Sequence, residues 1–185
     1  MMSKPVLMIH EIEDRLFDLP LHDYILTFDD GLYSHYYHFD KFKDIDTEKI
    51  FFISTGIVCS GKQSDGFPKS SVAHEKAFAG NYEDFMTMSQ ILELREQPNV
   101  TIGAHGHSHT NLNKFATLNE QVKHISNDTR QMLSWFSFHF GYIPTSFCFP
   151  YNNDLRGMYT GLLKKYGFTD FYGGERIDGS TLSIS

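Results

Sequence analysis

Cysteine is scarce in this chain of 185 residues. Only Cys59 and Cys148 occur, far apart and outside any spacing typical of a zinc site. Because disulfide-stabilised folds need several cysteines close together in sequence, a disulfide framework is not expected. No repeat, low-complexity tract or linker divides the sequence either. At this length we expect one domain, residues 1–185, that is large enough to bury a substantial core.

An excess of basic charge is also missing. The chain has 16 Lys and Arg against 23 Asp and Glu, a formal net charge of −7. This balance argues against a nucleic-acid or anionic-membrane surface, because both call for basic patches. Long hydrophobic runs are absent as well: the apolar segment that begins at Val6 has only about five residues, too short for a signal peptide or a membrane span. We therefore expect a soluble protein, cytoplasmic by default, whose oligomeric state the sequence does not indicate.

Short apolar segments rich in β-forming residues alternate with longer segments of helical period. The expected strands are residues 6–9, 24–28, 50–54, 100–103 and 146–149. The expected helices are residues 82–96, 118–140 and 154–166. This alternation predicts an α/β fold with a mostly parallel sheet and helices outside it. Residues 56–81 have no clear period, and we expect a long loop there.

The most informative segment follows the fourth expected strand. It contains three histidines in five residues, His105, His107 and His109. Neutral imidazole is the most common protein ligand for transition metals, and two histidines from one loop can hold a metal when a carboxylate joins them. Candidate carboxylates, Asp29 and Asp30, follow the second strand. In a parallel α/β barrel the carboxyl ends of all strands meet at one face, so we expect these segments to converge.

Two adjacent carboxylates suit metal-assisted hydrolysis. One can complete a three-ligand site whose next position stays open for water, and the other can accept the proton of that water. Neighbouring side chains of a strand point in opposite directions, so Asp29 and Asp30 are expected to have different roles. Gly31 allows the backbone to turn sharply just after them.

These motifs resemble those of a known family. Residues 27–31, Thr-Phe-Asp-Asp-Gly, followed by two histidines four residues apart at His105 and His109, are similar to the first two motifs of the polysaccharide deacetylases. These are the NodB-homology domains of carbohydrate esterase family four. The resemblance extends from the first strand to Tyr172 or its vicinity. It implies a single catalytic domain with a distorted (β/α) barrel, complete or incomplete, as its fold.

The resemblance also implies a role for each matching residue. Asp30, His105 and His109 would bind the metal, and Asp29 would be the general base that activates water. His107 lies between the two histidine ligands, and we expect it to point away from the metal and to have a structural role.

Two departures from the family pattern concern the surroundings of the base and the acid. Pro150-Tyr151 resembles the third motif, in which the tyrosine backbone N–H would help to stabilise the oxyanion. The arginine that often stands two residues before that proline is replaced by Cys148, which leaves the role of orienting the base unfilled. Of the fourth motif, an acid and an aromatic residue that support the catalytic histidine, Asp178 is the one candidate.

The fifth motif of the family, Leu-x-His near the C-terminus, has no counterpart, because no histidine follows His139. The opening segment 6–10, Val-Leu-Met-Ile-His, instead resembles circularly permuted members such as the poly-N-acetylglucosamine deacetylases. In those proteins the last strand and its histidine come first. The resemblance therefore implies a circularly permuted fold with His10 as the general acid that protonates the leaving amine.

The resemblance implies a hydrolase that uses a divalent metal to remove acetyl groups from N-acetylated carbohydrate. Zinc is the first candidate, and nickel, cobalt and iron suit the same ligands. Three alternatives stay open. The substrate could be a non-sugar amide, or the chain could be a metal- or glycan-binding module without turnover. His107 and His109 could also form the His-x-His pair of metal phosphoesterases or amidohydrolases, although those proteins usually place the pair on their first strand.

Overall fold

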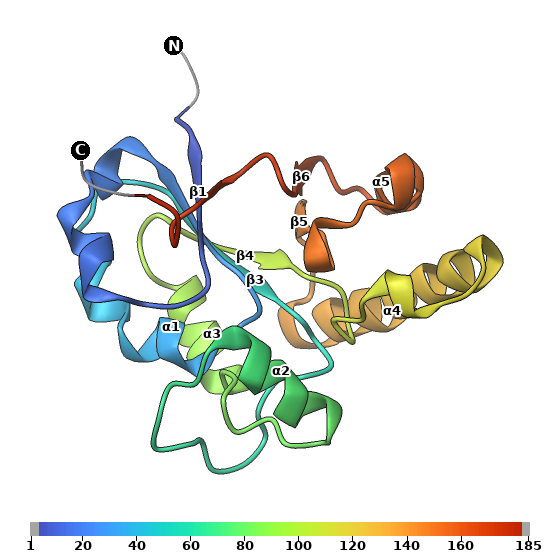
Figure 1. Cartoon of the computed structure of the whole chain (residues 1–185), viewed down its shortest axis with the longest axis horizontal. Coiled ribbons are helices and arrows are strands. Elements are labelled where there is room, and N and C mark those ends of the chain that lie inside the picture. The colour runs from blue at the N-terminus through green and yellow to red at the C-terminus, as the bar shows by residue number, and fades with distance from the viewer. Residues whose placement is uncertain (1–3, 183–185) are drawn as a thin grey trace.

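The computed structural model describes residues 4–182, and a seven-stranded parallel sheet lies at its centre (Figure 1). The strands are β1 (Val6–Ile9), β2 (Ile25–Phe28), β3 (Lys49–Ile53), β4 (Val100–Ala104), β5 (Ser146–Cys148), β6 (Asp170–Tyr172) and β7 (Ile177–Asp178). Their order across the sheet is β6-β5-β4-β3-β2-β1-β7, and every pairing is parallel. All five expected strands form, each within about one residue of its expected bounds, which is ordinary boundary scatter.

The sheet curls because its two edge strands are joined by a short segment. β6 and β7 lie at opposite edges, yet only residues 173–176 separate them in the sequence. An extended chain spans at most ~3.6 Å per residue, so this connection holds the two edges within ~18 Å of each other. The predicted distorted (β/α) barrel is confirmed in an incomplete form. The strand that precedes His10, β1, lies between β2 and β7, as in a circularly permuted barrel.

α-Helices cover the outside of the sheet. They are α1 (Tyr33–Tyr37), α2 (Ser70–Phe78), α3 (Met88–Arg95), α4 (Leu118–Phe140) and α5 (Met158–Lys164). Figure 1 shows α4 and α5 beside the β4–β6 end of the sheet, and α1, α2 and α3 below the opposite end. α4 has the predicted bounds, because Thr117 and Glu120 form a capping box at its start and Gly141 ends it with φ 72°.

The other two predicted helices are shorter than expected. In the segment 82–96 only α3 is helical, because Thr87 caps its start and forms a capping box with Gln90. In the segment 154–166, a 3₁₀ turn at Leu155–Gly157 comes first. α5 starts after Gly157, whose φ of 86° interrupts the helical conformation.

The long loop expected at residues 56–81 is a wrong prediction, because α2 lies within it. Ala73 and Ala77 are buried on this helix and pack in one cluster with Leu32, Ile57 and Phe85. Alanine adds little to a hydrophobic period, so the sequence pattern does not reveal the helix. The helix matters for the site, since its first turn reaches the carboxyl end of β2.

Phenylalanine fills much of the core. Among the largest fully buried side chains are Phe28, Phe42, Phe51, Phe52, Phe85, Phe136, Phe147 and Phe168. The ring of Phe28 on β2 stacks on that of Phe51 on β3, with centroids 4.5 Å apart, and meets Phe42 edge to face. Full burial of one such side chain contributes about 1.5–3 kcal/mol. The rings therefore anchor β2, which ends at the carboxylate pair, firmly in the sheet.

Both cysteines are free and buried, so the expectation of no disulfide framework is confirmed. Within residues 4–182, no helix is at once long and apolar enough to pass through a membrane.

Candidate active site

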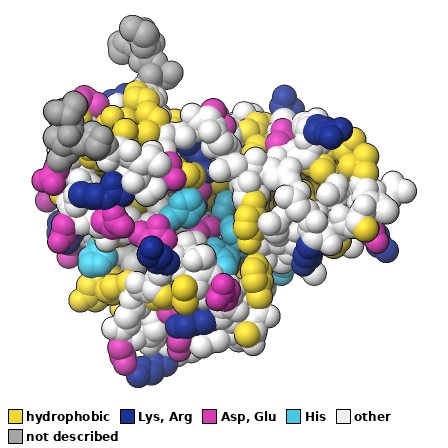
Figure 2. Space-filling model, viewed as in Figure 1, with side chains coloured by type: hydrophobic (Ala, Val, Ile, Leu, Met, Phe, Trp, Pro, Cys, Tyr) yellow, Lys and Arg dark blue, Asp and Glu magenta, His cyan; other side chains and the backbone are white. Residues whose placement is uncertain are grey.

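The carboxyl ends of the strands surround a pocket of about 500 Å³, a size that suits a small-molecule site. The residues expected to bind the metal or take part in catalysis all line it: His10, Asp29, Asp30, His105, His109 and Tyr151. They follow β1, β2, β4 and β5, so the shared direction of parallel strands brings them together. In Figure 2, histidine side chains gather in a hollow at the centre of this face, with acidic side chains beside them.

Backbone strain is concentrated around this pocket. The chain leaves β2 at Asp30 with φ 76°, and Gly31 has the same φ. Seven non-glycine residues of the described chain have positive φ; those that line the pocket are Asp30, His109, Tyr151 and Asn152. Such conformations cost on the order of 1–3 kcal/mol each and cluster at functional sites. This concentration makes the pocket the candidate functional site.

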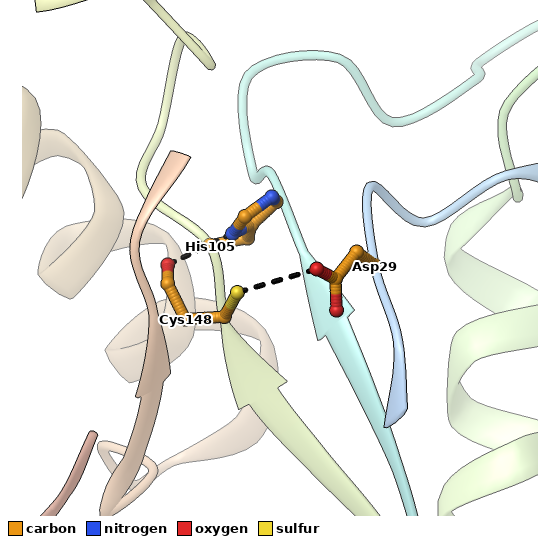
Figure 3. A group of neighbouring side chains, drawn as sticks. All are labelled: Asp29, His105 and Cys148. Carbon is orange, nitrogen blue, oxygen red and sulfur yellow. Dashed lines mark hydrogen bonds between the residues drawn. The ribbon is translucent and has the colours of Figure 1, made fainter. Parts of the chain in front are cut away.

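Asp29 is 2% exposed and is bound by a guanidinium group. Arg176 donates from Nη1 to Oδ1 at 2.7 Å and from Nη2 to Oδ2 at 2.8 Å. Burial raises the pKa of Asp29, but the charge and hydrogen bonds of Arg176 outweigh burial and hold that pKa below its ordinary value. The Cys148 thiol also donates to Asp29 Oδ2, at 3.4 Å (Figure 3). Asp29 is therefore ionised and fixed in orientation.

Arg176 corrects the expectation that no arginine orients the base. It lies between β6 and β7, far from Asp29 in sequence, and is 7% exposed. Its Nη2 also lies 3.1 Å from the sulfur of Cys148, the residue that stands where the family often has its arginine. No local motif marks Arg176. The strands on either side of it, β6 and β7, are not among those expected from the sequence, so no signal near position 176 indicated its role.

Asp30 faces imidazoles instead of a guanidinium. His105 Nε2 lies 3.1 Å and His109 Nε2 lies 3.0 Å from its Oδ1, and Ser70 Oγ donates to its Oδ2 at 2.5 Å. Burial raises the pKa of Asp30, but protonated His109 and His105, which pair with it when no metal is bound, outweigh burial and hold that pKa well below its ordinary value. The two neighbouring carboxylates thus have different partners, as the alternation of side chains predicts.

A buried carboxylate on α4 holds the histidine loop in place. Asp128 accepts the backbone N–H of His107 at 2.7 Å, and the N–H and hydroxyl of Ser108 at 2.9 and 2.6 Å. Gly106, at φ 74°, passes so close that a Cβ there would lie 2.9 Å from Asp128 Oδ2. The ring of His107 turns to Thr55, whose Oγ1 lies 2.8 Å from Nδ1, so its side chain is directed away from Asp30.

The hydrogen bonds of His105 test whether a metal fits beside Asp30. Its Nδ1 donates to the Cys148 carbonyl at 2.8 Å (Figure 3), which leaves Nε2 as the lone-pair nitrogen of a neutral imidazole. This lone pair faces the ionised carboxylate, so two acceptor atoms lie 3.1 Å apart. A positive charge between them resolves the contact, either a second proton on the ring or a metal ion in its place. Imidazole and carboxylate ligands suit zinc, nickel, cobalt or iron, so the residues fit a divalent transition metal.

Two groups of three buried side chains could in principle hold an ion. Each group has its potential ligand atoms within 4.8 Å of one another: Asp30, His74 and His109 in one, and Asp29, His105 and Cys148 in the other. The second group already contains a cation, because Arg176 contacts both Asp29 and Cys148. Burial and the nearby Asp29 charge also raise the pKa of Cys148 well above its ordinary value, so the thiol stays protonated. The Asp30 side therefore suits a metal better, although its group holds only Asp30 and His109 of the three predicted ligands and His105 falls in the other group.

His74 on α2 is a pocket residue that the sequence analysis did not select. It is 5% exposed, and its ring stacks on that of His109 with centroids 3.9 Å apart. Its Nε2 lies 3.8 Å from Asp30 Oδ1, and burial lowers its pKa. His74 was not selected because the sequence pattern did not reveal α2. Ser70 and His74 lie one helical turn apart on the same face of α2, a relation that a loop assignment hides.

His10 follows β1 and faces both carboxylates. Its Nε2 lies 3.8 Å from Asp29 Oδ2 and 3.9 Å from Asp30 Oδ2, which is beyond hydrogen-bond distance. Buried His35 donates from Nε2 to the His10 carbonyl at 2.7 Å and so fixes the backbone there. Asp178, the candidate acid for supporting a catalytic histidine, accepts a backbone N–H from its own β7 turn.

Tyr151 lies after β5 in a 3₁₀ turn, Pro150–Asn152, with φ 55°. Its ring tilts toward His109, with centroids 5.0 Å apart, and the residue is 48% exposed. The turn therefore brings both the backbone and the ring of Tyr151 to the edge of the pocket.

Comparison with known families gives a match over most of the chain. Residues 20–170 match the family model described as polysaccharide deacetylase. The comparison with curated proteins gives no match.

Solved structures resemble this chain at low sequence identity. IcaB from Ammonifex degensii has a TM-score of 0.62 and 21% identity, over 83% of this chain and 66% of that one. A de-N-acetylase from Aggregatibacter actinomycetemcomitans has a TM-score of 0.58 and 13% identity, over 95% and 77%. The Streptococcus pyogenes deacetylase PplD, solved with acetate, has a TM-score of 0.56 and 15% identity, over 86% and 79%. The likeness establishes the fold, and this chain spans about two thirds of the length of the Ammonifex structure.

Proposed function

We propose that residues 1–185 form one catalytic domain that removes acetyl groups from N-acetylated carbohydrate with a divalent metal ion. The premise is the family: this chain belongs to the polysaccharide deacetylases. The observation that carries the proposal is the split of the carboxylate pair. Asp29 is paired with Arg176, whereas Asp30 faces the imidazoles of His105 and His109. Amide hydrolysis needs both a base that stays ionised and an electrophilic group, and the two carboxylates are arranged for these two tasks.

Asp30, His105 and His109 would hold the metal, with zinc first among zinc, nickel, cobalt and iron. When bound, such an ion polarises a carbonyl group and lowers the pKa of water. The hydrogen bond from His105 Nδ1 to the Cys148 carbonyl keeps Nε2 free of a proton and aimed at the site.

Asp29 would accept the proton of the attacking water. Its pKa is held below the ordinary value, so the carboxylate is ready to accept at neutral pH. Asp29 Oδ1 has a second lone pair besides the one that faces Arg176, whereas Oδ2 also accepts from the Cys148 thiol. Orientation by the arginine therefore does not consume the base. Arg176 is a positioning residue in this scheme, since it touches the base and not the substrate.

His10 would protonate the amine as the C–N bond breaks. Water supplies the hydroxyl group of the acetate product, and the amine leaves with the proton from His10. Its position near Asp29 suits a base and an acid that act on the two ends of the same amide. The backbone N–H of Tyr151 would donate to the oxyanion of the tetrahedral intermediate.

Two observations support a catalytic over a purely binding role. The idea of a module without turnover depended on the missing arginine and on the poorly matched fourth motif, and Arg176 takes the role of that arginine from another part of the chain. The matching family model is that of polysaccharide deacetylases, and the structures that share the fold include a de-N-acetylase and a deacetylase; together these support acetyl groups on carbohydrate as the target.

Acetate release from N-acetylglucosamine oligomers tests the proposal. We expect release with added metal, background release after chelation, and a kcat/KM lowered roughly 10²–10⁴-fold in Asp29→Asn and in His10→Ala. His139→Ala, on the exposed side of α4, is the control variant. Wild-type rates for Asp29→Asn in metal-replete buffer would contradict the mechanism. Release from cyclic or linear non-sugar amides, and none from the oligomers, would contradict the substrate.

A further inference from the structure

α2 lies against the pocket through its first turn. Ser70 donates its hydroxyl to Asp30 Oδ2 at 2.5 Å and its backbone N–H to Glu11 Oε1 at 3.0 Å. His74 comes four residues later, on the same face of the helix. The contacts of Ser70 therefore fix where the His74 ring can lie, and that ring is directed at the same carboxylate.

The two ring nitrogens of His74 have different surroundings. Nδ1 lies 2.9 Å from the Ser70 carbonyl oxygen, which can only accept, so Nδ1 bears the proton of the neutral ring. Nε2 is then the lone-pair nitrogen. It is buried without a hydrogen-bond partner among residues 4–182, and it lies 3.8 Å from Asp30 Oδ1. A buried lone pair beside a carboxylate needs a positive group that both atoms can bind.

His105 on the β4 loop has the same arrangement as His74 on α2. In each ring, Nδ1 is bound to a main-chain carbonyl and Nε2 faces Asp30 Oδ1. His109, which stacks on His74, has its own Nε2 3.0 Å from that oxygen. Three imidazoles from two separate segments thus converge on one carboxylate oxygen. The ligand atoms of Asp30, His74 and His109 lie within 4.8 Å of one another, close enough to share an ion after small side-chain shifts.

We propose that His74 is a further ligand of the metal that Asp30, His105 and His109 would hold. This inference rests on the proposed function, which assigns the other three ligands. Three imidazole nitrogens and one carboxylate oxygen favour transition metals over Mg²⁺ and Ca²⁺, which prefer oxygen ligands. His74 would be a fourth protein ligand, and the position for water would then be a fifth one, to which zinc sites can expand. α2 thereby becomes part of the metal site.

The competing role for His74 is packing alone. Its ring stacks on His109 and meets Phe85 edge to face, with centroids 5.4 Å apart. His74→Phe separates the two roles, because phenylalanine keeps a flat ring in the stack and has no nitrogen. His109→Phe is the matched reference for losing a ligand. His139→Ala, on the exposed side of α4, is the control for losing a histidine elsewhere.

The experiment measures zinc and cobalt binding by the full chain after a chelator has stripped it. X-ray absorption of the zinc-loaded wild-type protein should show three imidazole ligands, and that of His74→Phe should show two. A competition titration should show a zinc affinity lowered roughly 100-fold in His74→Phe. The visible spectrum of the cobalt-loaded protein should change in His74→Phe and stay the same in His139→Ala. Circular dichroism without metal checks folding, and the wild-type ligand count decides the question even if the variant does not fold.

Two results would overturn the assignment of His74 and leave the proposed function intact. One is a count of two imidazoles in the wild-type protein. The other is wild-type zinc affinity and cobalt spectrum in His74→Phe beside a large loss in His109→Phe. A wild-type chain that binds neither zinc nor cobalt would instead contradict the metal-dependent function itself, and the inference with it.

Discussion

The two sides of the carboxylate pair differ in where their positive charge comes from. On the Asp29 side the fold supplies it, since Arg176 binds both carboxylate oxygens. On the Asp30 side the neighbours are imidazoles, and His105 presents a lone pair to the carboxylate and not a proton. One side is a complete ion pair, and under the proposed function a metal ion completes the other. The two adjacent aspartates therefore differ in chemistry, because distant segments of the chain supply a different partner to each.

The two sides are also held differently. Arg176 belongs to the short connection that links the sheet edges, so its position depends on the curl of the barrel. The histidine loop is held by Asp128 on α4 through the N–H groups of His107 and Ser108. A change that disturbs one side should therefore leave the other largely in place.

Neutralising the carboxylates one at a time should have the largest effect. Asp30→Asn removes the charged ligand, so we expect zinc affinity to fall at least ~100-fold and acetate release to match that of the chelated wild type. Asp29→Asn should lose activity roughly 10²–10⁴-fold and still bind zinc. Competition titration and acetate release on the same preparations provide the measurement. Equal zinc affinities in the two variants would mean that the two sides do not differ in this way.

Arg176→Gln should have the next largest effect, and it acts on stability. It leaves the Asp29 charge buried without its partner, which lowers the free energy of unfolding by about 3–5 kcal/mol. The double variant with Asp29→Asn has neither charge and should recover much of that loss, as a double-mutant cycle in urea would measure. If Arg176→Gln alone is as stable as wild type, the ion pair does not neutralise Asp29.

Asp128→Asn should weaken the metal side moderately. The amide can no longer accept the full set of hydrogen bonds from the histidine loop, so we expect zinc affinity to fall about 10-fold and the free energy of unfolding to fall by about 1–3 kcal/mol. Asp154→Asn is the matched control, because Asp154 accepts the N–H of Thr160 on α5. Unchanged zinc affinity in Asp128→Asn would show that the loop keeps its shape without this carboxylate.

Cys148→Ser should have the smallest effect. A hydroxyl can donate to Asp29 Oδ2 in place of the thiol, so we expect the free energy of unfolding to change by about 1 kcal/mol and kcat/KM to change less than in Arg176→Gln. Cys59→Ser, at the other buried free cysteine, is the control. A larger activity loss than in Arg176→Gln would mean that the thiol, and not the guanidinium, sets the position of the base.

Much of the pocket followed from local patterns. Asp29 and Asp30 come directly after one apolar strand, and His105 and His109 come just after another. His10 is the residue after the first strand. Parallel strands all present their carboxyl ends at one edge, so a single assumption about strand direction places these residues together. The alternation of side chains along a strand was enough to predict that the two neighbouring aspartates point in different directions.

Only the tertiary structure decided what surrounds these residues. Arg176 reaches Asp29 because the connection from β6 to β7 spans the two sheet edges, and no pattern near position 176 indicates that path. His74 reaches Asp30 because α2 packs through two small alanines, which leave almost no hydrophobic period. Strand ends are specified by short-range apolar patterns that the sequence displays. The partners of a buried charge depend on sheet curvature and helix packing, which arise from contacts between residues far apart in the chain.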